Sequence, residues 1–300
     1  MDKESFFSKG KAFFKIIFSL FFLNLLFLFS SCQSLSKLKP YIQEEENFHT
    51  MSLEIPVCPA TQYSKIEEHE DHEVHTYNGF QLCYRESYEQ AEWVSYTITR
   101  AELVKVTGRT NDFRPDTQIS TGSAELSDYK GSGFDRGHLA PSADMTWSKE
   151  SASDSFLLSN MSPQRPAFNR KMWKTLEESV RSWADYFGHV VVITGPLLEK
   201  DSSQYETIGA NKVSVPEFYY KALLTSVTVQ GREKYIALAF IMPNENIKGS
   251  IWDFACNVDQ VEKRSGLDFF SLLPDFEEKI VESSNDFSLW KEALEMEKHH

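Results

Sequence analysis

The chain has 300 residues, a sequence pI near 5.1 and a formal net charge of −13 at pH 7. This negative charge argues against a protein that binds nucleic acid through a basic surface, because phosphate contacts need Lys and Arg. The charge is uneven, however, since residues 101–174 carry ten basic and nine acidic side chains. The aromatic content of 14% suits the filled core of one large domain.

The N-terminus has the pattern of an export signal. An apolar run of 14 residues, 16–29, follows a basic start and is too short to span a bilayer, which takes about 20 residues. Small residues then precede Cys32, and this pattern resembles the bacterial lipoprotein box. The resemblance implies a signal peptide over residues 1–31, a lipid on Cys32, and anchoring to the cell envelope at the outer membrane or in the periplasm. The alternative is an ordinary signal peptide with an incidental cysteine.

Residues 32–75 are predicted to form an acidic tether. His69, His72 and His75 recur every third residue there, a spacing that could indicate a metal site. We interpret the stretch as a solvated lead-in instead, because neither a helical nor a strand repeat puts all three on one side. Export implies an oxidising compartment, but the sequence does not decide whether a disulfide forms among Cys58, Cys83 and Cys256.

Residues 76–283 have the composition of a globular domain, and residues 284–300 are expected to be a charged, peripheral tail. Aromatic and β-branched runs predict several strands, and apolar periodicity predicts several helices. The expected strands cover 80–84, 93–99, 190–196, 218–229 and 234–242, and the expected helices cover 168–186, 251–264 and 275–282. This irregular alternation favours an α+β fold with a mixed, mainly antiparallel sheet and helices packed on it.

The helix expected over residues 168–186 has two stripes. An apolar stripe predicts the side that faces the core, and a second stripe carries polar groups at intervals of four. The apolar stripe is Met172, Leu176, Val180 and Trp183, and the second is Asn169, Trp173, Glu177 and Arg181. On the residues alone, Glu177 and Arg181 could also be an ordinary surface ion pair.

Two motifs carry the chemistry. The first is Asp135-Arg136-Gly137-His138, in a glycine-rich segment that lets the backbone turn tightly. The second is the segment 158–164, which contains Asn160 and is followed by Asn169 four residues before Trp173. Together they resemble the DNA/RNA non-specific endonucleases, the family of endonuclease G, over residues 77–273. The resemblance implies a ββα-metal core, also called a His-Me finger, in which the motif histidine leaves a strand and the metal-binding asparagine opens a helix.

The resemblance also implies the main roles in the site. His138 is the general base, and an imidazole with an ordinary pKa near 6.5 suits that task. Asn169 is the one direct protein ligand of Mg²⁺, or of Mn²⁺ or Ca²⁺, which prefer oxygen ligands. The competing interpretation of Asn169 is a helix N-cap. Glu177 is expected to accept hydrogen bonds from waters around the cation.

Arg136, Arg181 and Arg109 are candidates for phosphate contact, because a planar guanidinium matches phosphate oxygens. Arg114 is a rival to Arg109, whose loop matches the family loosely. Asn160 is expected to brace the site. Asp135 is expected to act as a supporting partner for nearby donors.

The function predicted from these residues is metal-dependent endonuclease activity on DNA and RNA. Contacts to phosphate and metal cannot read bases, so we expect little sequence specificity. One alternative is an envelope phosphodiesterase of the same fold that acts on small or lipid-linked diesters. The other is a non-enzymatic lipoprotein scaffold. The sequence does not fix the oligomeric state, and a homodimer is one option.

Overall fold

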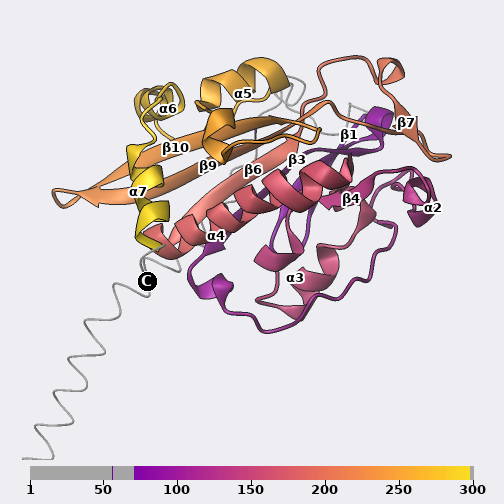
Figure 1. Ribbon diagram of the computed structural model, residues 1–300, viewed down its shortest axis with the longest axis horizontal. Coiled ribbons are helices and arrows are strands. Elements are labelled where there is room, and N and C mark those ends of the chain that lie inside the picture. Colours follow the sequence, from indigo (N-terminus) through magenta and orange to yellow (C-terminus); the bar gives the residue numbers. More distant parts are fainter. Residues whose placement is uncertain (1–55, 57–70, 298–300) are drawn as a thin grey trace, which may run out of the picture. The chain divides into compact units, whose positions relative to one another are not determined.

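The computed structural model describes Pro56 and residues 71–297 (Figure 1). The expected signal peptide, Cys32, Cys58 and His69 lie outside the described residues, as do the last three residues of the chain. In the part that is described, none of the helices has the length and apolar character needed to cross a bilayer.

A seven-stranded sheet forms the centre of the domain, and every pair of neighbouring strands in it runs antiparallel. The spatial order is β1, β2, β3, β6, β9, β10, β11. The strands are β1 His72–Thr76, β2 Gln81–Arg85, β3 Gln90–Thr99, β6 His189–Pro196, β9 Phe218–Val229, β10 Arg232–Pro243 and β11 Ala255–Cys256. The α+β prediction is therefore confirmed. The turn between the two longest strands has positive φ angles at Gln230 and Gly231, which match a tight hairpin.

Helices cover both faces of the sheet (Figure 1). The long helix α4, Lys174–Phe187, crosses one face and contacts β3, β6 and β9. Two shorter helices, α5 Val258–Ser265 and α6 Asp275–Glu282, pack against β10 on the other face. The C-terminal helix α7, Ser288–Glu297, packs against α4.

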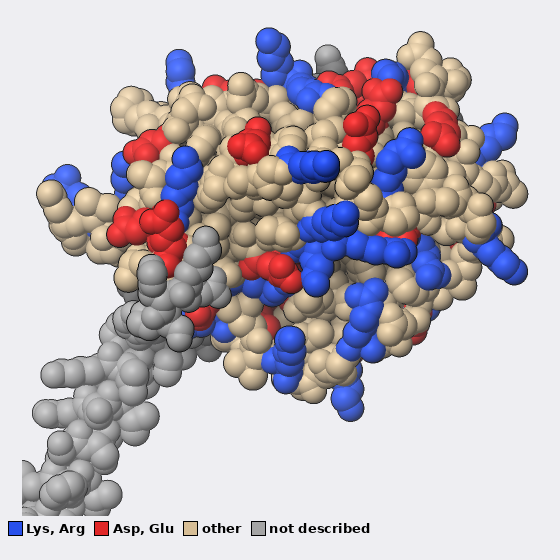
Figure 2. Space-filling view, viewed as in Figure 1, with Lys and Arg blue, Asp and Glu red and all other residues tan. Residues whose placement is uncertain are grey.

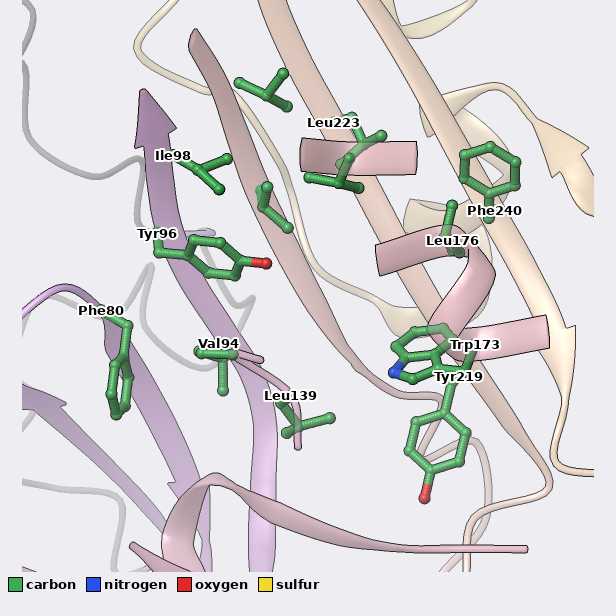
Figure 3. Packing of buried hydrophobic residues seen from close by; sticks show 14 of the residues in the cluster. Phe80, Val94, Tyr96, Ile98, Leu139, Trp173, Leu176, Tyr219, Leu223 and Phe240 are labelled. Atoms are coloured by element: carbon green, nitrogen blue, oxygen red, sulfur yellow. The ribbon is translucent and has the colours of Figure 1, made fainter. Parts of the chain in front are cut away.

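The main core lies between α4 and the sheet (Figure 3). All four residues of the predicted apolar stripe are buried there, between 0% and 8% exposed. They meet inward-facing side chains of alternate strand positions, such as Val94, Tyr96 and Leu223. Large aromatic rings fill much of the space, which agrees with the aromatic-rich composition.

A short two-stranded hairpin and small helices lie beside this core. The hairpin pairs β4, Asp135–His138, with β5, Met161–Gln164. The small elements include α2 Leu126–Tyr129, α3 Lys149–Asp154 and the strand pair β7 Thr207–Ile208 and β8 Val213–Ser214, together with 3-10 turns at Glu86–Tyr88, Ala101–Leu103, Ser142–Asp144, Leu158–Asn160, Ser202–Gln204 and Ile251–Phe254. The hairpin places the first motif directly beside the second.

Four expected boundaries differ from the structure. Residues 72–75 do not belong to a tether, because they pair with β2 as an edge strand. Residues 288–297 are not a peripheral tail, because Trp290 is fully buried against Trp183 and Phe187. The helix expected over 251–264 is broken by β11, which pairs with β10. The helix expected over 168–186 begins with a π-helical turn, Phe168–Trp173, before α4.

Candidate active site

The β4–β5 hairpin positions the first motif. Its register pairs Asp135 with Gln164 and His138 with Met161. A Cβ atom at Gly137 would lie 2.2 Å from the Gln164 side chain, so a larger residue at this strand position would force that buried side chain to move. Because side chains alternate along a strand, Asp135 and His138 project to opposite faces of the hairpin.

His138 lies at the end of β4 in an aromatic pocket. Its ring meets Phe156 edge-on at 5.0 Å and Phe113 at 5.7 Å between centroids. The Nε2 atom is buried and has no hydrogen-bond partner within the described part of the chain. Burial and the positive charges of Arg109 and Arg136 lower the pKa of His138 to about 3. The imidazole is therefore neutral at physiological pH, although this pKa lies well below the ordinary value near 6.5 that the sequence led us to expect for the base.

Asn169 lies in the π-helical turn that precedes α4. Its side-chain nitrogen donates a 3.0 Å hydrogen bond to Asp135. Its own backbone N–H donates to the carbonyl of Arg165, so it lies inside the first helical turn and is not an N-cap. Single π-turns inside α-helices occur frequently at functional sites.

The amide orientation of Asn169 follows from this contact. An ionised carboxylate can only accept hydrogen bonds, so the atom facing Asp135 must be the amide nitrogen. The carbonyl oxygen is then turned away from Asp135, where it is available to a hard cation. Asp135 also holds Arg170 through two hydrogen bonds of 2.6 and 2.8 Å, so the expected supporting role of Asp135 agrees with its contacts.

Two of the three candidate arginines stack on the aromatic residues that enclose His138. The guanidinium carbon of Arg136 lies 4.0 Å from the ring centroid of Phe113, and that of Arg109 lies 4.9 Å from the centroid of Phe156. Stacking fixes each guanidinium plane, and the Nε of Arg109 also donates a 2.7 Å hydrogen bond to Asn111, so the terminal N–H groups are the ones that could bind an anion.

The rival Arg114 does not point into this site. Its side chain donates to Asp112 and to the carbonyl of Ser153, and it pairs with Asp154. Arg109, by contrast, interacts electrostatically with both Glu177 and Arg136. The structure therefore brings Arg109 to the histidine and leaves Arg114 in a separate ion-pair network.

Glu177 and Arg181 project from α4 into a buried charge network. Arg181 donates a 2.7 Å hydrogen bond to Asp144, and Tyr96 donates one of 2.8 Å to the other oxygen of the same carboxylate. Burial raises the pKa of Glu177 to about 7, although the positive charges of Lys221 and Arg181 act in the opposite direction. The network thus links the helix to the central strands.

Asn160 is fully buried behind the histidine. Its side chain accepts a hydrogen bond from the Ala140 nitrogen and donates to the carbonyls of Ala140 and Ser155, at 2.9 to 3.0 Å. Its backbone carbonyl accepts from Leu139. These contacts pin the chain just after His138, as the bracing role requires, and they place Asn160 away from direct contact with substrate.

The sequence interpretation missed Lys221. This lysine lies on β9 with its ammonium group 4.8 Å from the Trp173 ring centroid and is completely buried. Burial lowers its pKa, and Glu177 and Asp144 oppose that shift. A single lysine inside the apolar run of β9 was a usable signal, because an unpaired buried lysine is very rare. Asp144, Phe113 and Phe156 gave no comparable signal.

The surface around α4 carries positive charge. Figure 2 shows Lys and Arg side chains gathered near the middle of the face on which α4 lies. Arg170 and Lys174, at the start of the helix, are 69% and 63% exposed. The acidic total of the chain therefore does not prevent a polyanion from reaching this face.

These features match one family. The family model for DNA/RNA non-specific endonucleases matches residues 59–276. The chain belongs to this family. Nuclease C1 of Cunninghamella echinulata var. echinulata is 38% identical over 208 residues, which are 65% of this chain and 81% of that nuclease.

Other DNA/RNA non-specific endonucleases agree with this assignment. The mitochondrial endonuclease G of Homo sapiens is 36% identical over 204 residues, covering 64% of this chain and 67% of the human protein. A crystal structure of an EndoG/EndoGI complex has a TM-score of 0.61 at 31% identity, covering 68% of this chain and 88% of that chain. The protein is therefore an endonuclease G-like nuclease, and its family depends on a divalent metal.

Proposed function

We propose that this endonuclease hydrolyses phosphodiester bonds of both DNA and RNA with Mg²⁺ as its usual ion, His138 as general base and Asn169 as the protein ligand of the ion. The observation that carries the proposal is the buried Nε2 of His138, which has no hydrogen-bond partner among the described residues. A buried polar atom without a partner is costly, so such atoms frequently mark functional sites.

The base step needs a neutral imidazole. His138 is neutral because burial and two neighbouring arginines lower its pKa to about 3. A water molecule held against this neutral imidazole can transfer a proton to a ring nitrogen as its oxygen attacks phosphorus. The edge-on contact with Phe156 holds the ring in one orientation for this transfer.

The donor set suits a hard divalent cation. The Asn169 carbonyl oxygen offers one neutral ligand, and Glu177 adds negative charge from the same helical segment when it is ionised. A cation bound there would stabilise charge on the phosphate and on the leaving 3′ oxygen. One neutral protein ligand implies weak binding of the free ion, and therefore ready exchange among Mg²⁺, Mn²⁺ and Ca²⁺.

The arginines would hold the substrate. Arg136 and Arg109 present guanidinium edges beside the histidine, and Arg181 keeps further donors after its bond to Asp144. These groups bind phosphate oxygens that every nucleic acid shares. None of these arginines is dedicated to contacts with base edges, so we expect cleavage with little sequence preference.

The proposal extends to location. The N-terminal pattern that resembles a lipoprotein box supports export and attachment of a lipid to Cys32, which would hold the nuclease at the cell envelope. A signal peptide without lipid attachment is the competing outcome. Labelling cells with a fatty-acid analogue separates the two, because Cys32→Ser removes the label only if the sulfur carries lipid.

Nicking of supercoiled plasmid by the purified chain tests the chemistry. We expect activity on plasmid and on RNA that EDTA abolishes and Mg²⁺ restores. His138→Ala should lower the rate by at least about 100-fold, the usual contribution of a positioned base. The matched control is His75→Ala on edge strand β1, which should leave the rate unchanged. Full activity of His138→Ala would refute the assigned base.

Asn169→Ala tests the ligand. We expect the rate to fall and the Mg²⁺ concentration for half-maximal activity to rise together. Wild-type activity of this variant at low Mg²⁺ would reject Asn169 as the ligand. Parallel assays with a nitrophenyl phosphodiester test the alternative small-diester activity, which requires cleavage of that compound without cleavage of plasmid.

A further inference from the structure

Three side chains with different metal-binding atoms converge on the sheet face opposite α4. They are His72 on β1, Cys83 on β2 and Glu92 on β3, and their ligand atoms all lie within 4.8 Å of one another. His72 Nδ1 lies 2.9 Å from Glu92 Oε1 and 3.7 Å from Cys83 Sγ. Cys83 and Glu92 are buried and His72 is largely buried.

The sheet register explains why these residues meet. His72 pairs with Arg85, two residues from Cys83, so His72 and Cys83 project from the same face. Cys83 pairs with Trp93 and Tyr84 with Ala91, so a β-bulge leaves Glu92 as the extra residue. Bulges re-aim side chains, and this one turns the Glu92 carboxylate toward the other two residues.

This arrangement is not a nucleophile relay. In a Cys–His–Glu relay the thiol and the carboxylate contact opposite ring nitrogens, as in the serine protease triad. Here both contact Nδ1 of His72. One nitrogen, one sulfur and one oxygen that face a common point form instead the ligand set of a transition-metal ion.

We propose that His72, Cys83 and Glu92 form a Zn²⁺ site that joins the edge strand β1 to β2 and β3. The geometry is close to what zinc requires. Bond lengths of about 2.3 Å to sulfur and about 2.0–2.1 Å to nitrogen and oxygen in a tetrahedron separate sulfur from nitrogen by about 3.6 Å and nitrogen from oxygen by about 3.4 Å. The first distance is already present, and the second requires the His72–Glu92 contact to open by roughly 0.5 Å.

The charges around the site also suit a dication. Zn²⁺ with the Cys83 thiolate and the Glu92 carboxylate is neutral in sum. The second oxygen of Glu92 accepts a 3.1 Å hydrogen bond from Arg85, and Arg85 is in turn paired with Asp71 at 2.6 Å. A carboxylate ligand held in this way by an outer partner is the usual arrangement in zinc sites. Binding would release the thiol proton of Cys83 to solvent.

This site is separate from the nuclease chemistry. Leu82 and Tyr84, the neighbours of Cys83, point into the core beneath α4, so Cys83 points to the opposite face. Near Glu92 on that face lies Tyr220, whose hydroxyl donates to the Glu92 backbone carbonyl. The site should therefore stabilise the N-terminal edge of the sheet, and the inference does not depend on the proposed catalytic roles.

Cobalt substitution tests the site, because a thiolate ligand gives Co²⁺ a sulfur-to-metal charge-transfer band and the oxygen ligands at Asn169 do not. The experiment uses the full chain under reducing conditions, with Cys83 kept as its sole cysteine by Cys32→Ser, Cys58→Ser and Cys256→Ser. We expect the band at one equivalent of Co²⁺ and its loss when Zn²⁺ is added. A chain with Cys256 as its sole cysteine is the matched control and should give no band.

Affinity measurements complete the test. Zn²⁺ should raise the melting temperature of the wild-type chain, and Glu92→Gln should bind Zn²⁺ at least about tenfold more weakly, since even outer-partner changes cost that much. Absence of the band in the Cys83-only chain overturns the proposal, and so does a band that persists after Cys83→Ser. The first result needs no destabilised variant, because the Cys83-only chain retains all three proposed ligands.

Discussion

The amide nitrogen of Asn169 and a carboxylate oxygen of Asp135 lie 3.0 Å apart, which joins the first motif to the π-helical turn that carries Asn169. This bond sets which atom of the amide faces the proposed cation position. The bond also explains the role of Asp135 in the first motif. This residue projects away from His138, and we expect it to support Asn169 and not to act as a base.

Replacing Asp135 should therefore act through Asn169. In Asp135→Ala the amide loses its fixed orientation, and we expect the Mg²⁺ concentration for half-maximal activity to rise about 10- to 100-fold, the usual effect of losing an outer partner. Titration of Mg²⁺ in the plasmid assay measures this. Glu199→Ala, which breaks a similar bidentate pair with Arg264, is the control. An unchanged Mg²⁺ requirement in Asp135→Ala would contradict the assigned orientation.

The acidic limb of the pH profile should depend on Glu177. Its pKa is raised to about 7, so the carboxylate gains a proton as pH falls through 7 and loses its negative charge. The pKa of His138 is about 3, so the base stays neutral over this range. We expect the rate to fall below pH 7 in the wild type and to be low and nearly independent of pH between 5 and 8 in Glu177→Gln. A wild-type-like limb in that variant would assign the titration to another group.

Replacing Lys221 should shift the acidic limb of the pH profile and change the stability of the fold only slightly. The positive charge of this lysine lowers the pKa of Glu177, so Lys221→Met should move the acidic limb to higher pH. The rate at pH 7 then falls and recovers as pH is raised toward 9. Because methionine has a similar volume, we expect the free energy of unfolding to change by less than about 1.5 kcal/mol. Lys200→Met, at an exposed lysine, should leave the profile unchanged, and an equal loss at every pH would refute this role.

The C-terminal helix should be essential to stability. Trp290 is fully buried, and its backbone carbonyl accepts a 2.8 Å hydrogen bond from the Trp183 indole. Trp290→Ala should lower the free energy of unfolding by about 3–5 kcal/mol, as measured by urea denaturation. Its neighbour Leu289 is 40% exposed, and Leu289→Ala should have a much smaller effect. Equal losses in the two variants would show that the helix contributes no specific packing.

The sequence predicted the features that depend on short-range pattern. Runs of aromatic and β-branched residues predicted β9 and β10 closely, and the i, i+4 spacing correctly predicted the buried side of α4, because burial of one side imposes that spacing. The two motifs indicated His138 and Asn169, and the structure connects their elements through Asp135.

Long-range contacts were beyond prediction from pattern. The charges of Lys221 and Glu177 interact only because β9 lies beneath α4, and nothing local in either segment encodes that proximity. The charged residues around Trp290 predicted a tail, because they obscure a short apolar stripe. This stripe becomes part of a core only where it packs against α4. The sequence predicted a solvated lead-in at His72 because the partners of this residue come from β2 and β3. A β-bulge brings Glu92 to His72, and no pattern of residues predicts that bulge.

The π-helical turn at Phe168–Trp173 has a consequence for how this nuclease tolerates insertions and deletions. A π-turn contains one residue more than the α-helix would use, and each α-helical residue rotates the chain by about 100°. Deleting the exposed Lys171 would convert the turn into regular helix while α4 stays anchored by its buried side. The carboxamide of Asn169 would then swing around the helix axis relative to Glu177, so a single deletion at the surface would misalign two groups that no substitution had touched.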